Sequence, residues 1–221
     1  MTERGIIFSG QMVKAILDGT KTQTRRILRQ QPYDDGGIWR WKHGRHNVAV
    51  PGPNALDLEE WAIWKECPYQ IGQTLWVRET WAAVHGDVED FHGSVDIPLG
   101  SGDGYWKVAY RADDTWETDR ADRGFDWRPS MFMPRWASRI TLTITDVRVQ
   151  RIQEISEDDA KAEGALRPLE WVTTDGSIFS DIATGTYRKG FAWLWGSINA
   201  KRGYGWDTNP WVWAISFRRE P

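Results

Sequence analysis

A basic stretch near the start of the chain, residues 19–29 (GTKTQTRRILR), holds the residue types best suited to chemistry. Its four cations and three hydroxyls, with no acid among them, are Lys21, Arg25, Arg26, Arg29, Thr20, Thr22 and Thr24. Such a cluster can bind an anion, and a lysine near a threonine can act as the base for a hydroxyl nucleophile. The alternative is a solvated charge run, because the macrodipole alone favours cations near a helix C-terminus.

The elements around this stretch must position it. Residues 11–18 are predicted to form a helix with Ile16 on its apolar side, and Gly19 is expected to end that helix in a left-handed conformation. A short buried strand is expected at residues 5–9, and residues 22–28 are expected to continue as a strand. Lys21 would therefore lie between a helix end and a strand.

Further strands are expected at residues 74–82, 105–110, 139–149 and 211–218. In the third of these, the apolar residues change parity between Ile144 and Val147, a phase switch typical of a bulge or of a sheet that curls into a barrel. The last strand is expected to place four residues in the core: Trp211, Trp213, Ile215 and Phe217.

Two more helices follow from local signals. Ser156 with Asp159 resembles a capping box and Gly164 is expected to close that helix. A second helix, residues 187–199, has an apolar stripe formed by Phe191, Leu194, Trp195 and Ile198. The proline-bounded segment 128–135 is expected to be an extended connection.

Four segments rich in turn-forming residues are predicted to be insertions: 31–68, 84–104, 113–135 and 165–185. Short strands with few helices predict an α+β fold, in which a single domain over residues 1–221 is built around a curved sheet or small β-barrel.

An aromatic and basic run lies in the first insertion, in a stretch without acids. If it forms a hairpin, its tryptophans share one face and its cations the other; the residues are Trp39, Arg40, Trp41, Lys42 and Arg45. Such a surface could stack on bases and contact phosphates.

Charge and composition restrict the partners, compartment and metal sites that can be expected for this chain. The net charge is −3, so a nucleic acid would have to bind a local patch. The lone Cys67, an N-terminus that lacks a signal peptide and apolar runs too short to cross a bilayer predict a cytoplasmic protein without a membrane partner. His43 and His46 are spaced H-x-x-H, but without a second cysteine or an HExxH sequence neither a metal nor a cofactor is expected.

Gly19, Lys21 and Arg26 fit the pattern G-x-K-x-x-x-x-R, which resembles the signature of the ASCH-domain family. That family belongs to the PUA-like superfamily, small β-barrels associated with RNA and modified bases. The segments GIIFSGQMVKAILDG, LWVRETWA and NPWVWAISF are similar to the longer ASCH proteins often carried by phages and prophages. The resemblance implies a PUA-like small curved β-barrel with flanking helices and loop insertions.

The resemblance also implies an activity. Small ASCH amidohydrolases remove the acetyl group of N4-acetylcytidine with a lysine, a threonine and a glutamate, and the matching residues are Lys21, Thr24 and Glu163. Lys21 and Thr24 lie three apart, so a turn or bulge is needed for them to converge.

Four residues are predicted to bind substrate: Arg25, Arg26, Arg78 and Glu79. Glu79 is also a competing acid, or with Arg78 a member of a structural ion pair. A non-catalytic reader of RNA or of a modified base and a ribonuclease remain as alternatives.

Overall fold

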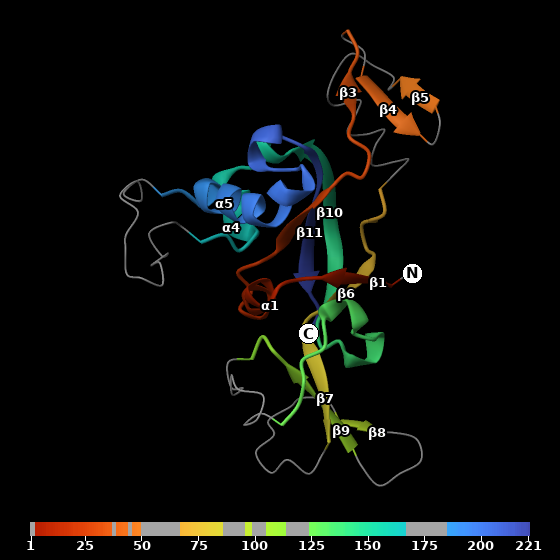
Figure 1. Cartoon of the computed structure of the whole chain (residues 1–221), viewed down its shortest axis with the longest axis vertical. Helices are drawn as coiled ribbons and strands as arrows, with labels where there is room; N and C mark the ends of the chain where they lie inside the picture. Colours follow the sequence, from red (N-terminus) through yellow and green to blue (C-terminus); the bar gives the residue numbers. More distant parts are fainter. Residues whose placement is uncertain are drawn as a thin grey trace. The chain divides into compact units, whose positions relative to one another are not determined.

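The computed structural model describes residues 3–36, 39–43, 46–49, 67–85, 96–98, 105–113, 124–166 and 185–221. These residues form an α+β fold, as predicted, with a five-stranded sheet and two three-stranded sheets (Figure 1). None of the described helices is long and apolar enough to cross a membrane.

The five-stranded sheet has the order β1-β6-β10-β11-β2. Its strands are β1 (Arg4–Ile7), β6 (Thr74–Arg78), β10 (Thr141–Arg151), β11 (Trp211–Arg219) and β2 (Gln23–Ile27). β1 pairs in parallel with β6, whereas β6 with β10 and β11 with β2 are antiparallel pairs. The order places β1 and β2 at the two edges.

The smaller sheets have the orders β3-β4-β5 and β7-β9-β8. Their strands are β3 (Tyr33–Asp34), β4 (Trp39–His43), β5 (His46–Ala49), β7 (Trp81–His85), β8 (Asp96–Pro98) and β9 (Tyr105–Tyr110). The helices are α1 (Gly10–Leu17), α4 (Glu157–Ala162) and α5 (Tyr187–Asn199). Short 3₁₀ turns complete the elements: η1 (Ser130–Phe132), η2 (Arg135–Ala137), η3 (Ile152–Glu154), η6 (Ala200–Arg202) and η7 (Trp206–Thr208).

The chain divides into two compact units, each assembled from segments far apart in the sequence. The first unit comprises Met1–Gly19, Gln73–Thr143 and Arg219–Pro221, and the second comprises Thr20–Gly72 and Ile144–Arg218. The single domain over residues 1–221 stays a prediction. So do the four insertions, large parts of which lie outside the described residues.

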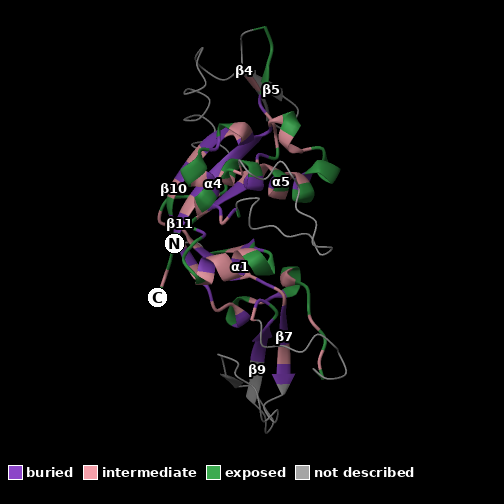
Figure 2. Cartoon of the chain, turned by 90° about the vertical axis from the view of Figure 1, so that its left-hand side faces the viewer, coloured by how far each residue is buried: buried purple, intermediate pink, exposed green. Residues whose placement is uncertain are grey.

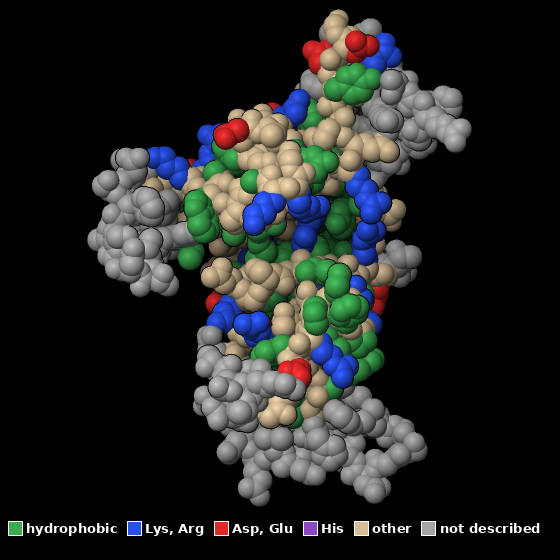
Figure 3. Space-filling view, viewed as in Figure 1, with side chains coloured by type: hydrophobic (Ala, Val, Ile, Leu, Met, Phe, Trp, Pro, Cys, Tyr) green, Lys and Arg blue, Asp and Glu red, His purple; other side chains and the backbone are tan. Residues whose placement is uncertain are grey.

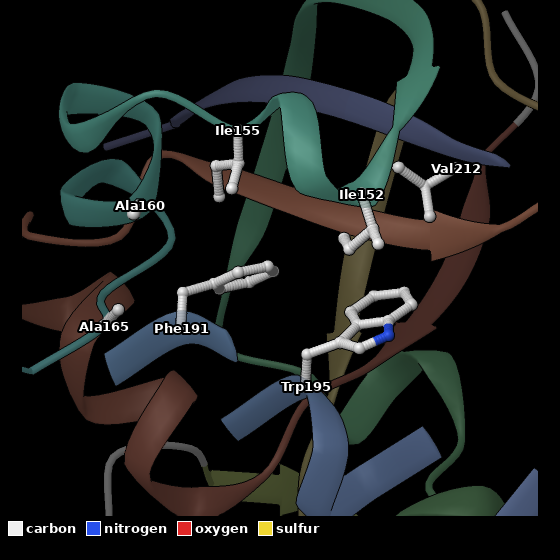
Figure 4. Packing of buried hydrophobic residues seen from close by; sticks show 7 residues of the cluster. All are labelled: Ile152, Ile155, Ala160, Ala165, Phe191, Trp195 and Val212. Atoms are coloured by element: carbon white, nitrogen blue, oxygen red, sulfur yellow. The ribbon is translucent and has the colours of Figure 1, made fainter. Parts of the chain in front are cut away.

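The core of the second unit lies where α4 and α5 meet the sheet. Its buried members are Ile152, Ile155, Ala160, Ala165, Phe191, Trp195 and Val212. Figure 4 shows the rings of Phe191 and Trp195 pointing from α5 toward the isoleucines of the segment before α4. The indole N–H of Trp195 donates to the carbonyl of Tyr204 at 2.8 Å, so this large ring is buried without a lost hydrogen bond.

The predicted stripe of α5 is partly wrong. Phe191 and Trp195 are buried, but Ile198 is 48% exposed and Asn199 is buried in its place. A polar residue is tolerated there because the Asn199 amide donates to the carbonyl of Trp195 at 3.2 Å, and its own carbonyl accepts from the Tyr204 N–H.

The predicted phase switch in β10 is present in its burial pattern. Leu142 and Ile144 are buried at one parity, and Val147 and Val149 at the other. Figure 2 shows β10 and β11 coloured by burial. In β11 the predicted core residues are buried, and so are Val212 and Ala214, so both faces of this strand are covered.

Two expectations in the first unit are wrong. Residues 74–82 do not form one strand: β6 ends at Arg78 and β7 begins at Trp81 in a different sheet. The break lies at Glu79, whose side chain pairs with Arg139. Segment 128–135 is not simply extended: η1 lies within it and η2 begins at its last residue, each directly after a proline.

Candidate functional site

The segment with Lys21 follows the end of α1. Gly19 has a φ of 75° and its N–H donates to the carbonyl of Ile16 at 3.1 Å, which is the expected left-handed helix end. Two residues later the Thr22 N–H donates to the carbonyl of Ala162 at 2.8 Å. This bond brings the start of the basic stretch to the C-terminus of α4.

The ends of α4 are fixed by local bonds. The hydroxyl of Ser156 accepts from the Asp159 N–H at 3.0 Å, as the capping pattern predicted. At the other end Gly164 has a φ of 75°, and the Ala165 N–H donates to the carbonyl of Ala160 at 3.2 Å. This Schellman-type end holds Glu163 as the C-cap residue of α4.

Lys21 and Glu163 form a buried ion pair in the second unit. The Lys21 Nζ lies 2.7 Å from Oε2 of Glu163, and the two residues are only 2% and 4% exposed. Nζ also donates to the Glu163 carbonyl at 2.8 Å and to the Gln23 carbonyl at 2.7 Å. An ammonium has three protons, so these acceptors match its full donor capacity.

Arg25 joins this pair to a second carboxylate. Its NH1 lies 3.1 Å from Oε1 of Glu163, and its NH2 lies 2.9 Å from Oδ2 of Asp159. The other Asp159 oxygen accepts from the Gln23 amide at 2.9 Å. Arg148 of β10 donates to Asp159 at 3.2 Å from the more exposed side.

Burial and charge act on the titration of this network. Burial lowers the pKa of Lys21, and the positive charges of Arg26 and Arg25 lower it further, while Glu163 raises it. Burial alone would raise the pKa of Asp159, but the Gln23 hydrogen bond and the charges of Arg148 and Arg25 hold it below its usual value. The arrangement therefore favours an ionised Asp159 and gives Lys21 a larger share of neutral amine at a given pH than a solvated lysine has.

Thr24 does not join Lys21 in this arrangement. It is a buried residue of β2, and strand alternation places its side chain on the face opposite to those of Gln23 and Arg25. Within the part of the chain that the structure describes, the Thr24 hydroxyl has no hydrogen-bond partner. The structure thus brings together two of the three predicted catalytic residues.

The remaining predicted substrate-binding residues lie in different places. Arg26 is half-buried in the second unit. Burial lowers the pKa of its guanidinium, whereas the charges of Tyr69 and Glu163 raise it. Arg78 and Glu79 belong to the first unit. The Arg78 guanidinium lies 4.7 Å from the ring centre of Trp76 and donates to the Met133 carbonyl at 3.2 Å.

Glu79 is held by a bidentate pair, with Arg139 Nε at 3.0 Å from Oε1 and NH2 at 3.1 Å from Oε2. Burial raises the pKa of Glu79, whereas the bonds and charge of Arg139 lower it. Arg139 also pairs with Asp113 and lies 4.0 Å from the ring centre of Tyr110. This is the structural ion pair that was the alternative to substrate binding, with Arg139 rather than Arg78 as the partner.

The predicted hairpin is formed by β4 and β5, paired antiparallel with His43 opposite His46. Arg40 is half-exposed and forms an ion pair with Asp35. The other predicted nucleic-acid contacts lie outside the described residues: Arg45 entirely, and Trp39, Trp41 and Lys42 in their side chains. No group of three metal-ligating side chains occurs among the residues that are described.

Sequence reasoning missed Asp159 and Arg148 as members of the site. Asp159 was recognised only as part of the helix cap, although its position four residues before Glu163 puts both carboxylates on one helical face. That spacing was the available signal. For Arg148, a half-buried cation within a long strand, we find no distinguishing signal.

Comparison with known proteins gave no match to a family model, a curated protein or a solved structure.

Proposed function

We propose that the chain is an ASCH-type, PUA-like domain that binds a nucleoside or RNA and hydrolyses an amide on a modified base. The observation that carries this proposal is the buried Lys21–Glu163 ion pair, at 2.7 Å. Buried ionisable groups with a shifted pKa, as Lys21 has, are enriched at catalytic sites. The substrate class comes from the family resemblance.

The reaction is the conversion of an N4-acetylcytidine-type amide and water into a free amine and acetate. Lys21 lies within proton-transfer distance of Glu163, so transfer of one proton gives a neutral amine and a carboxylic acid. The amine then accepts the proton of the Thr24 hydroxyl as its oxygen attacks the acetyl carbonyl. Glu163 protonates the departing N4, and water hydrolyses the resulting acetyl ester.

This mechanism makes one structural demand. Thr24 must reach Lys21, whose amino group contacts Gln23 and Glu163 in the structure as described. Substrate binding must therefore exchange one of these contacts for the Thr24 hydroxyl. Arg26 is the group proposed to bind a phosphate or polarise the carbonyl, because its fork suits either role.

The test is incubation of the purified protein with N4-acetylcytidine and with acetylated RNA, with chromatography of the products. We expect release of cytidine and its loss in Lys21→Met, Glu163→Gln and Thr24→Ala. Thr22→Ala is the matched control, because Thr22 is an exposed threonine of the same stretch. Equal background turnover by the unmodified protein and by Thr24→Ala would contradict the enzymatic proposal.

The second candidate is a non-catalytic reader of RNA or of a modified base. It is favoured by the β4–β5 hairpin, which carries the alternating tryptophans and cations, and by the lack of a bond between Thr24 and Lys21. On the face seen in Figure 3, Lys and Arg side chains are more prominent than acidic ones, which suits an anionic ligand.

A reader of this kind should lose affinity for single-stranded RNA as salt rises. Each lost phosphate contact should lower the slope of log K against log salt by about 0.7. Arg40→Ala and Lys42→Ala should therefore flatten the slope, whereas Thr22→Ala should not. Shortening of the RNA during the assay would point instead to the ribonuclease alternative.

A further inference from the structure

Two carboxylates of α4 contact the same guanidinium. Asp159 and Glu163 lie four residues apart, so they share one face of the helix. NH2 of Arg25 contacts Asp159 at 2.9 Å and NH1 contacts Glu163 at 3.1 Å. Each carboxylate uses its second oxygen elsewhere: Asp159 accepts from Gln23, and Glu163 accepts from Lys21.

This arrangement fixes the rotation of the Glu163 carboxylate. The Arg25 side chain is fully buried, with its guanidinium 5.7 Å from the ring centre of Phe191. A guanidinium is planar and its N–H groups diverge at fixed angles, so holding one nitrogen at Asp159 determines where the other points. A Glu163 carboxylate bound at Oε1 from that direction turns Oε2 toward Lys21.

We infer that Arg25, held by Asp159, is a positioning residue that turns the Glu163 carboxylate toward Lys21. The inference rests on the proposed function for its catalytic meaning, but its geometric and electrostatic content can be measured without turnover.

The charged groups around Lys21 determine how its pKa should respond when Arg25 is replaced. Glu163 faces it from the end of α4, and Arg25 and Arg26 face it from β2, the two arginines lowering its pKa and Glu163 raising it. Beyond Arg25 lie Asp159 of α4 and Arg148 of β10. Near Arg26 lies Tyr69. Without the charge of Arg25, the Lys21 ammonium loses a repulsive neighbour, and Glu163 no longer shares its negative charge with that second cation.

The experiment is a pH titration of the Lys21 amine by ¹H–¹⁵N NMR of the lysine amino groups, with the Lys21 signal assigned through Lys21→Arg. In Arg25→Gln the pKa of Lys21 should rise, so that a smaller share of the amine is neutral at a given pH below the pKa. The matched control is Arg148→Gln. Its guanidinium contacts Asp159 but, among the described residues, not Glu163, so Lys21 should titrate as in the unmodified protein.

A second variant protects the test against misfolding. In the double variant Arg25→Gln/Asp159→Asn, two neutral amides replace the buried ion pair, and the pKa of Lys21 should still rise because Glu163 has lost its other cation. Arg25→Lys keeps the charge but loses the fork, so Lys21 should titrate nearly as in the unmodified protein. An unchanged Lys21 titration in a folded Arg25→Gln or double variant overturns the inference, as does an equal rise in Arg148→Gln.

Activity provides the second readout. If the domain hydrolyses acetylated cytidine, the acidic limb of its pH–rate profile should move to higher pH in Arg25→Gln by as much as the Lys21 titration does, with kcat at neutral pH lowered and KM unchanged. Arg25→Lys should keep the limb in place yet lower kcat, because one ammonium cannot orient both carboxylates. A shifted Lys21 titration in a protein without turnover would support the role of Arg25 and refute the hydrolase. Turnover with an unmoved limb would refute the role of Arg25 alone.

Discussion

The ammonium of Lys21 meets the carboxylate of Glu163 at 2.7 Å, although 142 residues separate them in the sequence. Both groups are buried, so each is the main compensation for the other's charge. The contact depends on two backbone features, the hydrogen bond from Thr22 to Ala162 and the helix end at Gly164. Charge pairing and backbone geometry therefore specify the same arrangement.

Removal of one partner should be much more harmful than removal of both. We expect Glu163→Leu to lower the free energy of unfolding by about 3–5 kcal/mol, because Lys21 then becomes an uncompensated buried charge. The double variant Lys21→Met/Glu163→Leu should lose clearly less than the sum of the two single variants. Urea denaturation of all four proteins gives the coupling energy, and strictly additive losses would contradict a buried pair.

Thr24 should separate chemistry from folding. Its hydroxyl has no hydrogen-bond partner within the described part of the chain, so Thr24→Val should change the free energy of unfolding by about 1 kcal/mol or less. The same variant should abolish hydrolysis of N4-acetylcytidine, because the proposed nucleophile is gone. Thermal unfolding and the chromatographic assay on one preparation test both. A large loss of stability would assign Thr24 a structural role instead.

Asp159 should contribute stability that depends on pH. Its pKa in the folded protein is held below its usual value, so its contribution is complete above the ordinary aspartate pKa of about 3.9 and is lost as the pH falls through the lower folded value. Asp159→Asn should therefore be less stable than the unmodified protein at neutral pH, and the difference should shrink in acid. Urea denaturation at a series of pH values measures this. Asp158→Asn, at an exposed neighbouring position of the same helix, is the matched control.

Gly5 should be intolerant of a side chain because it lies under Trp76. A Cβ there would approach the Trp76 ring to 2.9 Å, below the range of real contacts. We expect Gly5→Ala to cost about 1–3 kcal/mol of unfolding free energy, the usual range for overpacking. Gly10→Ala is the matched control: it meets no atom within 4 Å and lies in α1, so it should be neutral or stabilising. Equal effects of the two substitutions would argue against the close approach.

Much of the secondary structure could be predicted because its causes are local. The parity pattern of β11, the left-handed Gly19 and the Ser156 cap all depend on residues within a few positions of one another. A curved PUA-like barrel could not be predicted in the same way, because closure of a sheet depends on several strands rather than on the pattern of one. It stays a proposal.

The features that were missed depend on partners far along the chain. Glu79, at the break between β6 and β7, pairs with Arg139, which lies 60 residues further on. Arg25 and Asp159 are 134 residues apart, and each already had a local explanation, in a basic run and in a helix cap. A single sequence gives no reason to join them. The Lys21–Glu163 contact was expected only because the family resemblance named both residues.

The position of β2 at the edge of the five-stranded sheet, with β11 as its neighbour, has a consequence for biosynthesis. A ribosome delivers β2 early and β11 only after nearly all of the described chain has emerged. Until then β2 lacks β11, its neighbour in the five-stranded sheet, and its cations are not yet held against the carboxylates of α4. We therefore expect the strand that carries Arg25 to dock, and the Lys21–Glu163 pair to form, late in translation.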